Sequence, residues 1–407
     1  MTTSAWRLVE DPQPHPQTPA SPRRSGSVSR RMLVMAAVLL LTLVGAGGLA
    51  AADSAAVALP ERPDGCDRPD RSIKLYAVEL PRDGNLIRLG YGLTPETASY
   101  PGPTMEMTEG ECLSITLYNQ VPVATLEQLR TNPLHPLGVS LHVHGVKYTQ
   151  LSDGTAQSSS YVPPGQSRTY TWYAAKRNKA TGSPGTAGYW WYHDHVVGGP
   201  HGTQGLGAGL FGGLVVRRSG DPKPDRTYVT VFGDQQSINL RRGAATDTCD
   251  ETNPQPGPTC LIARKGEKVE FIVVGIGNDM HTFHVHGHSW ADTRTGRLPT
   301  QGDVDSVQII DNKTLGPGDS FGVQVTAGDS VGPGHWMVHC HMQFHSDAGM
   351  STMLHVLDEN GNMPPGHDHA HAGAAARGAG NAAPNAAPAN GAAQPASGGQ
   401  QATHQHR

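Results

Sequence analysis

The segment WMVHCHMQFHSDAGM, from Trp336 to Met350, brings several strong metal ligands together. Two imidazoles and a thiolate, with a thioether as a weak axial ligand, form the trigonal site of a blue copper ion. The segment offers Cys340, His345 and Met350 for this site. The second histidine of this site must come from elsewhere in the chain. We assign His281, because it lies three residues before His284 and so does not share a strand face with the pair His284 and His286.

Three further histidine clusters precede this segment. Residues two apart in a strand point to one face, so each H-x-H pair presents two imidazoles together. In HCH, the cysteine points to the face opposite its two histidine neighbours, so one strand can serve two metal sites. Eight imidazoles suit three copper ions, shared as two, three and three, at a contact between domains. The eight are His142, His144, His193, His195, His284, His286, His339 and His341.

Simpler explanations exist for each motif alone. Single H-x-H pairs are common on exposed strands, and a lone buried cysteine usually behaves as a small apolar residue. Structural zinc prefers closed sites with four ligands. Four clusters with these mutual spacings in one chain favour copper over all of these.

Strands must position the clusters. The 407 residues include 50 Gly and 32 Pro, and only 16% are charged. Short β-type runs such as RSIKLYAVEL and GYWWYHDH alternate with turn residues, and no long stretch has a helical period. The pattern restarts after SGDPKPD at residues 219–225. We therefore predict an all-β fold of two Greek-key β-sandwich domains at residues 59–220 and 221–360.

The two ends of the chain have a different composition. Arg30 and Arg31 precede an apolar run ending in small residues, which predicts a twin-arginine export signal within residues 1–58; an uncleaved membrane anchor is the alternative. Residues 361–407 are rich in Ala, Gly and Pro and are expected to be a disordered tail, whose histidines are solvated or bind metal loosely. The net charge of −4 and the absence of a basic stripe argue against nucleic acid as a partner.

Four cysteines remain outside the copper motif, and in an exported protein such cysteines can form disulfides. Four cysteines allow three pairings. We favour Cys66–Cys112, which share one region, and Cys249–Cys260, which bracket a short loop.

These motifs resemble those of the multicopper oxidases, in particular the small two-domain laccases of bacteria, over residues 65–358. The resemblance implies two cupredoxin domains and four copper ions per subunit equivalent, with no blue copper in domain 1. It places type 1 copper on His281, Cys340, His345 and Met350, type 2 copper on His142 and His284, one type 3 copper on His144, His193 and His341, and the other on His195, His286 and His339.

The resemblance also implies an assembly. Larger laccases have a middle domain for which this chain has no room, so the implied form is a homotrimer in which domain 1 of one chain meets domain 2 of its neighbour. Tyr148 would donate an electron near the cluster, and Asp153 and Asp311 would guide protons. The alternative for both aspartates is ordinary turn chemistry.

The implied activity is oxidation of phenols or aromatic amines coupled to reduction of O₂ to water, with electrons passing through Cys340. Known small laccases have tyrosines where this chain has GNDM, at residues 277–280, so Asp279 is expected to favour cationic or amine substrates, or Cu(I). A cuprous oxidase, a copper nitrite reductase with its type 1 site in domain 1, and a copper carrier are the rival functions.

Overall fold

The computed structural model describes residues 61–243, 249, 259–296 and 307–364. The predicted export signal lies outside the described residues, as do the histidines of the predicted tail. Within the described part of the chain, no helix is both long and apolar enough to cross a membrane.

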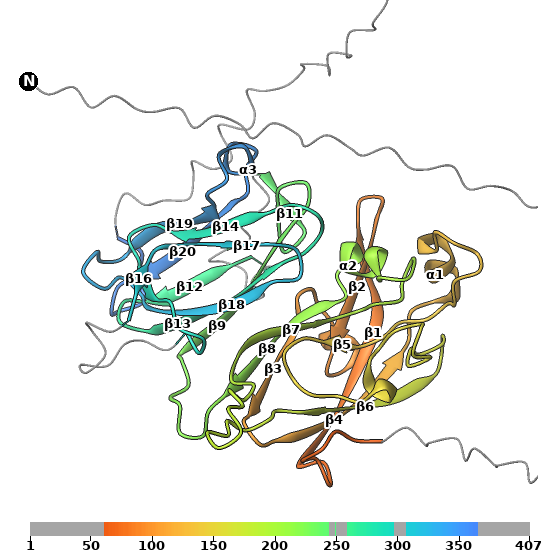
Figure 1. Cartoon of the computed structure of the whole chain (residues 1–407). Helices are drawn as coiled ribbons and strands as arrows, with labels where there is room; N and C mark the ends of the chain where they lie inside the picture. Colours follow the sequence, from red (N-terminus) through yellow and green to blue (C-terminus); the bar gives the residue numbers. More distant parts are fainter. Residues whose placement is uncertain (1–60, 244–248, 250–258, 297–306, 365–407) are drawn as a thin grey trace, which may run out of the picture. The chain divides into compact units, whose positions relative to one another are not determined.

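The first sandwich consists of two four-stranded sheets (Figure 1). One has the order β2(Leu86–Gly92), β1(Arg71–Asp83), β4(Cys112–Asn119), β6(Ser167–Tyr173). The other has the order β3(Gly102–Thr108), β8(Phe211–Arg217), β7(Gly188–His193), β5(His142–Val143). Short helices connect the strands: η1(Pro95–Thr97), α1(Val123–Leu129), η2(Gln150–Ser152) and α2(Thr203–Ala208).

The second sandwich consists of two five-stranded sheets and a two-stranded ribbon. The first sheet has the order β11(Arg241–Arg242), β10(Ser237–Ile238), β9(Arg226–Gly233), β13(Lys268–Gly275), β18(Ser320–Thr326). The second has the order β12(Leu261–Arg264), β20(Ser351–Leu357), β19(Gly334–Cys340), β14(His281–Val285), β17(Asn312–Leu315). The ribbon pairs β15(Trp290–Ala291) with β16(Ile309–Ile310), and α3(Gln343–Asp347) follows β19.

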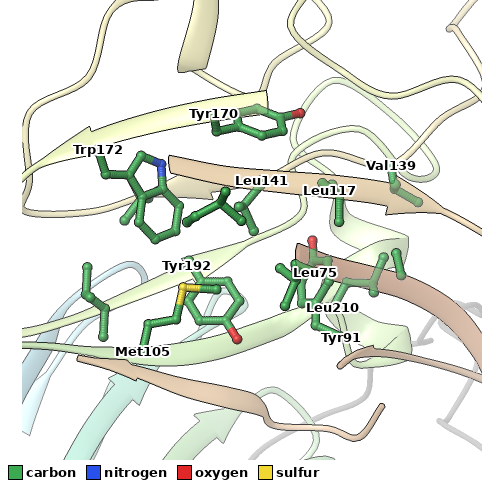
Figure 2. Close-up of a cluster of buried hydrophobic side chains, with 14 of the residues drawn as sticks. Leu75, Tyr91, Met105, Leu117, Val139, Leu141, Tyr170, Trp172, Tyr192 and Leu210 are labelled. Atoms are coloured by element: carbon green, nitrogen blue, oxygen red, sulfur yellow. The ribbon is translucent and has the colours of Figure 1, made fainter. Parts of the chain in front are cut away.

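Each sandwich encloses its own apolar core. In the first, alternate residues of β1 and β4 face inward, and Leu75 and Leu117 pack with Tyr170, Trp172 and Tyr192 (Figure 2). Burying such side chains stabilises the fold by roughly 25 cal/mol per Å² of apolar surface. The all-β prediction with two cupredoxin-like sandwiches is confirmed, and the predicted junction at 219–225 lies between β8 and β9.

A buried polar network joins the two sandwiches. Glu270 of β13 is fully buried. It accepts hydrogen bonds from Arg217 of β8 at 2.6 Å and from the hydroxyl of Tyr189 of β7 at 2.7 Å. The hydroxyl of Thr227 also donates to Glu270, at 2.7 Å. Tyr189 also packs in an apolar cluster with Val215 and Ile272, so the Glu270 end of the network is shielded from water.

Both predicted disulfides are present. Cys66 is bonded to Cys112, and Cys249 to Cys260. Cys340, buried in the second sandwich, is the free cysteine. The sequence contains five cysteines, so Cys340 is the one thiol left for a metal.

Candidate metal centre

The second sandwich places one thiol between two imidazoles. Cys340 Sγ lies 3.6 Å from His345 Nδ1 and 3.9 Å from His281 Nδ1, and all three residues are buried. We call these three residues the cysteine group. The main-chain N–H of Thr282 donates to Sγ at 3.4 Å, as suits a sulfur that becomes negative on metal binding.

Local folding fixes this group. β14 supplies His281 and pairs antiparallel with β19, which ends at Cys340. The segment after β19 contains α3 and leads to Met350, just before β20. The N–H of Met350 donates to the His345 carbonyl at 3.0 Å. Cys340 N–H donates in turn to the Met350 carbonyl at 3.1 Å. Met350 is fully buried in the same core, next in the chain to β20.

Four histidines gather on the opposite face of the same strands; we call them the second histidine set. His286 Nε2 and His339 Nε2 lie 3.2 Å apart. The ring of His284 lies 5.3 Å from that of His339 and 5.2 Å from that of His341. The separation of Cys340 from its two neighbours is the one that strand alternation requires.

The first sandwich has an equivalent arrangement, the first histidine set. His144 Nε2 and His193 Nε2 lie 3.2 Å apart. The ring of His142 lies 5.3 Å from that of His193 and 5.2 Å from that of His195. β5 and β7 position the set, because His142 of β5 pairs directly with His193 of β7.

Main-chain carbonyls orient the rings. His142 Nδ1–H donates to the Asp153 carbonyl and His284 Nδ1–H to the Asp311 carbonyl, each at 2.6 Å. His193 bonds the Asp194 carbonyl in the same way, at 2.8 Å. A histidine that donates from one nitrogen leaves the other as a lone-pair donor to a metal. Nε2 is therefore the ring nitrogen that remains available to a metal in His142, His284 and His193.

Burial keeps the histidines neutral, which is the form that binds copper. It lowers the pKa of His144 and of His281 to about 4, with the neighbouring imidazoles adding to the effect. It lowers the pKa of His193 well below its usual value, so the ring is neutral. Burial raises the pKa of the Cys340 thiol, so a bound metal ion must displace its proton. Neutral imidazoles beside one thiol fit copper.

The other predicted residues lie beside the histidine sets. The Tyr148 ring is 5.7 Å from the His142 ring, and burial together with Asp153 raises the pKa of its hydroxyl. The Asp153 carboxylate is 3.7 Å from His142 Nδ1. Asp311 is exposed, and its carbonyl bonds His284.

Sequence reasoning missed several supporting residues. Trp191 stacks on His193 and on His144, with ring centroids 4.2 and 4.7 Å apart. Asp194 is fully buried, which raises the pKa of its carboxyl to about 6. It accepts the N–H groups of Ser140 and Val197, at 2.8 and 2.7 Å, and so shapes the loop between two predicted ligands. The one signal was its place between two histidines.

In the described ranges, the three groups of metal-ligating atoms that lie within 4.8 Å of one another are each drawn from one sandwich. The first holds His142, His144 and His193; the second holds His284, His286 and His339; the third is the cysteine group. The two histidine sets thus form separate groups of metal-ligating atoms, one in each sandwich.

Known proteins share these features. Two adjacent family profiles, both described as multicopper oxidase, match residues 97–221 and 222–360, well over half of the chain. A probable nitrite reductase–hydroxylamine oxidoreductase fusion protein of Kuenenia stuttgartiensis is 32% identical over 72% of this chain and 32% of its own length. Laccase-4 of Arabidopsis thaliana is 28% identical over 57% of this chain and 40% of its own, and mouse ceruloplasmin 28% over 54% and 21%. The chain therefore spans less than half the length of these relatives.

Two solved structures are also similar to this chain. A multicopper oxidase has a TM-score of 0.49 at 21% identity, covering 74% of this chain and 92% of that chain. A copper nitrite reductase from Nitrosomonas europaea has 0.46 at 18%, covering 73% and 95%. The matched family profiles and the cysteine and histidine groups lead to one conclusion: this chain belongs to the multicopper oxidases, a family that implies copper and oxidoreductase chemistry.

Proposed function

We propose that this protein is a laccase-type oxidase that removes one electron from each of four phenol or aromatic amine molecules and reduces O₂ to two waters. Copper ions, when bound, supply the one-electron redox chemistry and the site for O₂. The chain supplies the ligands, their protonation states and the connection between the sites.

One observation carries this proposal: Cys340 and His339 are neighbours in the chain yet belong to different groups. Cys340 Sγ faces His281 and His345, whereas His339 Nε2 faces His286. His339 Nδ1–H also donates to the Cys340 carbonyl at 3.0 Å. One peptide unit therefore links the two groups covalently and by a hydrogen bond. A protein that only stored copper would not need such a connection.

The histidine pairs support four coppers per subunit equivalent. Each set contributes two Nε2 atoms 3.2 Å apart, suited to one ion, and two further rings. His142 and His284 occupy equivalent positions in the two sets, as two ligands of one shared type 2 ion would. His195 of the first set would then join the pair His286 and His339, and His341 of the second set would join the pair His144 and His193. Since each chain holds two separate histidine sets, we propose a head-to-tail homotrimer that joins the first set of one chain to the second set of its neighbour.

Nitrite reduction is the first alternative, since the Kuenenia relative is named for it. A copper nitrite reductase would need a type 1 cysteine in the first sandwich. Both cysteines of that sandwich are joined in a disulfide. The thiol available to a metal is Cys340 in the second sandwich, which favours the oxidase.

Oxidation of Cu(I) is the second alternative. Met280 and Met342, each adjacent in sequence to a predicted ligand, are 50% and 42% exposed. Exposed thioethers are soft ligands suited to Cu(I). This activity would use the same buried groups and would differ only in the electron donor.

The test measures oxygen uptake by the copper-loaded protein with a phenol and with Cu(I), and nitrite consumption with an electron donor under anaerobic conditions. Uptake of one O₂ per four phenol molecules, with the visible charge-transfer band of a copper–thiolate bond, is expected. Uptake driven by Cu(I) alone would make the protein a cuprous oxidase. Nitrite turnover without oxygen uptake would overturn the proposal.

A further inference from the structure

A cavity of about 720 Å³ lies between the two sandwiches. Its walls come from the β1–β2 hairpin and α2 on one side, and from β10, β11 and the turn after β13 on the other. The volume falls within the roughly 300–1,000 Å³ of typical small-molecule sites. Neither histidine set lines it.

The cavity wall is continuous with the cysteine group on two sides. Gly233 lines the cavity, and the ring of its neighbour Phe232 lies 5.8 Å from the His281 ring. On the other side, a Cβ added to Gly349 would lie 2.6 Å from Gly243 Cα, so the segment after β11 touches the loop that carries His345. A molecule in this cavity would therefore sit one layer of residues away from the cysteine group.

The charged part of the lining is dominated by arginine. Arg88 Nη2 and Arg241 Nη1 share one carboxylate oxygen of Asp83, at 3.4 and 3.5 Å. Arg242 adds a third, exposed guanidinium. The Nε–H groups of Arg88 and Arg241 are buried and have no hydrogen-bond acceptor. At this end of the cavity, the positive charge of the three arginines thus exceeds the negative charge of Asp83.

The second lining carboxylate does not restore the balance. Asp234 accepts the N–H of Asn278 at 2.7 Å and its side-chain amide at 2.8 Å. It also accepts the N–H of Asp279 at 3.1 Å. The Asp234 carboxylate is therefore hydrogen-bonded to the turn that precedes His281. Asp279, which belongs to this turn, does not line the cavity.

The rest of the lining is mixed: polar residues such as Thr203, Gln235 and Ser237 lie beside an apolar part. Leu86 at the hairpin, 55% exposed, faces a cavity that is also lined by Leu206, Leu240 and Ile276. Exposed large apolar side chains around a concave site are typical of ligand binding. An apolar part with a cationic end suits a flat ring that carries an anionic group.

We propose that this cavity binds the reducing substrate and that the preferred substrate is a phenol bearing a carboxylate, with the ring against Leu86, Leu206 and Leu240 and the carboxylate at Arg241 and Arg242. This inference rests on the proposed oxidase function. Each phenol loses one electron and its hydroxyl proton to become a phenoxyl radical. Four such oxidations supply the four electrons and four protons that convert one O₂ to two H₂O.

The test compares two phenols that differ only in the charged group. 3-(4-Hydroxy-3-methoxyphenyl)propanoate carries a carboxylate two methylenes from the ring, and 2-methoxy-4-propylphenol has a methyl in its place. For the Arg241→Gln/Arg242→Gln variant, the KM of the propanoate is expected to rise about tenfold at low salt, with kcat unchanged. The KM of the propylphenol is expected to stay within about twofold. Arg82→Gln, on the same hairpin but outside the cavity lining, is the matched control.

Calorimetric binding to the copper-free protein separates this inference from the proposed function. The propanoate is expected to bind the wild type and the Arg82→Gln control, and to bind the double variant about tenfold more weakly. Such binding without any oxidation of phenols would keep the site and overturn the oxidase function. Oxidation of both phenols with equal KM in all variants, or a preference for amines or Cu(I), would keep the oxidase function and overturn the site.

Discussion

The Nδ1 atom of His142 lies 2.6 Å from the main-chain oxygen of Asp153, while the Asp153 carboxylate lies at 3.7 Å. The second sandwich repeats the main-chain bond with His284 and Asp311. Ring orientation thus depends on the backbone of each aspartate, and the Asp153 carboxylate instead accepts a hydrogen bond from the Thr155 hydroxyl at 2.7 Å. The roles of the main chain and the carboxylate can be separated by substitution.

Asp153→Asn is expected to keep the full copper content, because the carbonyl that orients His142 is unchanged. If the carboxylate guides protons, reoxidation of the reduced protein by O₂ should slow by roughly tenfold or more. Copper analysis and stopped-flow reoxidation measure the two effects, with His142→Gln as the control that loses copper. Loss of copper from Asp153→Asn would assign the orienting role to the carboxylate instead.

Cys340→Ser is expected to abolish the visible charge-transfer band and phenol-driven oxygen uptake, since the hydroxyl does not replace a thiolate as a copper ligand. The histidine sets lie on the other strand face, so the electron paramagnetic resonance signal of the histidine-bound copper should persist. Loss of all copper signals would instead mean that the cysteine group is needed to form the histidine sets.

Strand periodicity explains why so much of the fold could be predicted. The run HWMVHCH corresponds to β19, and alternation along it correctly separates Cys340 from His339. β5 is shorter than its H-x-H motif predicts, because it consists of His142 and Val143 and ends before His144. Trp191 and the cavity depend on contacts between distant segments, which local sequence does not encode.

The proposed trimer predicts complementation between two inactive variants. His144→Ala disables the first histidine set, and His286→Ala disables the second. In mixed head-to-tail rings, about a quarter of the interfaces join two intact sets, so co-production should restore about a quarter of the wild-type activity. Light scattering should give the mass of three chains. A cluster built within one chain would leave the mixture inactive.

A salt bridge near the start of β9 predicts a pH-dependent stability. Arg226 donates to both oxygens of Glu267, at 3.0 and 3.1 Å, and this bond lowers the pKa of the Glu267 carboxyl. A carboxyl with a lowered pKa stabilises the fold above its unfolded value, about 4.3, and loses this contribution as the pH falls through the folded value.

Glu267→Gln should therefore lower the free energy of unfolding at pH 7 by about 0.5–1 kcal/mol, a small value because the pair is partly exposed to solvent. The difference from wild type should shrink as the pH falls below about 4.3 and disappear below the folded pKa of Glu267. Urea denaturation of the copper-free protein at several pH values measures it, and Arg226→Gln in both backgrounds isolates the pair. A difference that is constant with pH would indicate a packing effect of the substitution.

The buried network between the sandwiches predicts a larger loss of stability. Arg217→Met would leave Glu270 fully buried with donors only from Tyr189 and Thr227. Breaking one partner of a buried pair costs about 3–5 kcal/mol, because the remaining charge stays desolvated. Adding Glu270→Leu should recover part of that loss, since the unpaired charge is removed. Denaturation of the copper-free variants measures both steps, and no recovery in the double variant would mean that shape rather than charge dominates at this contact.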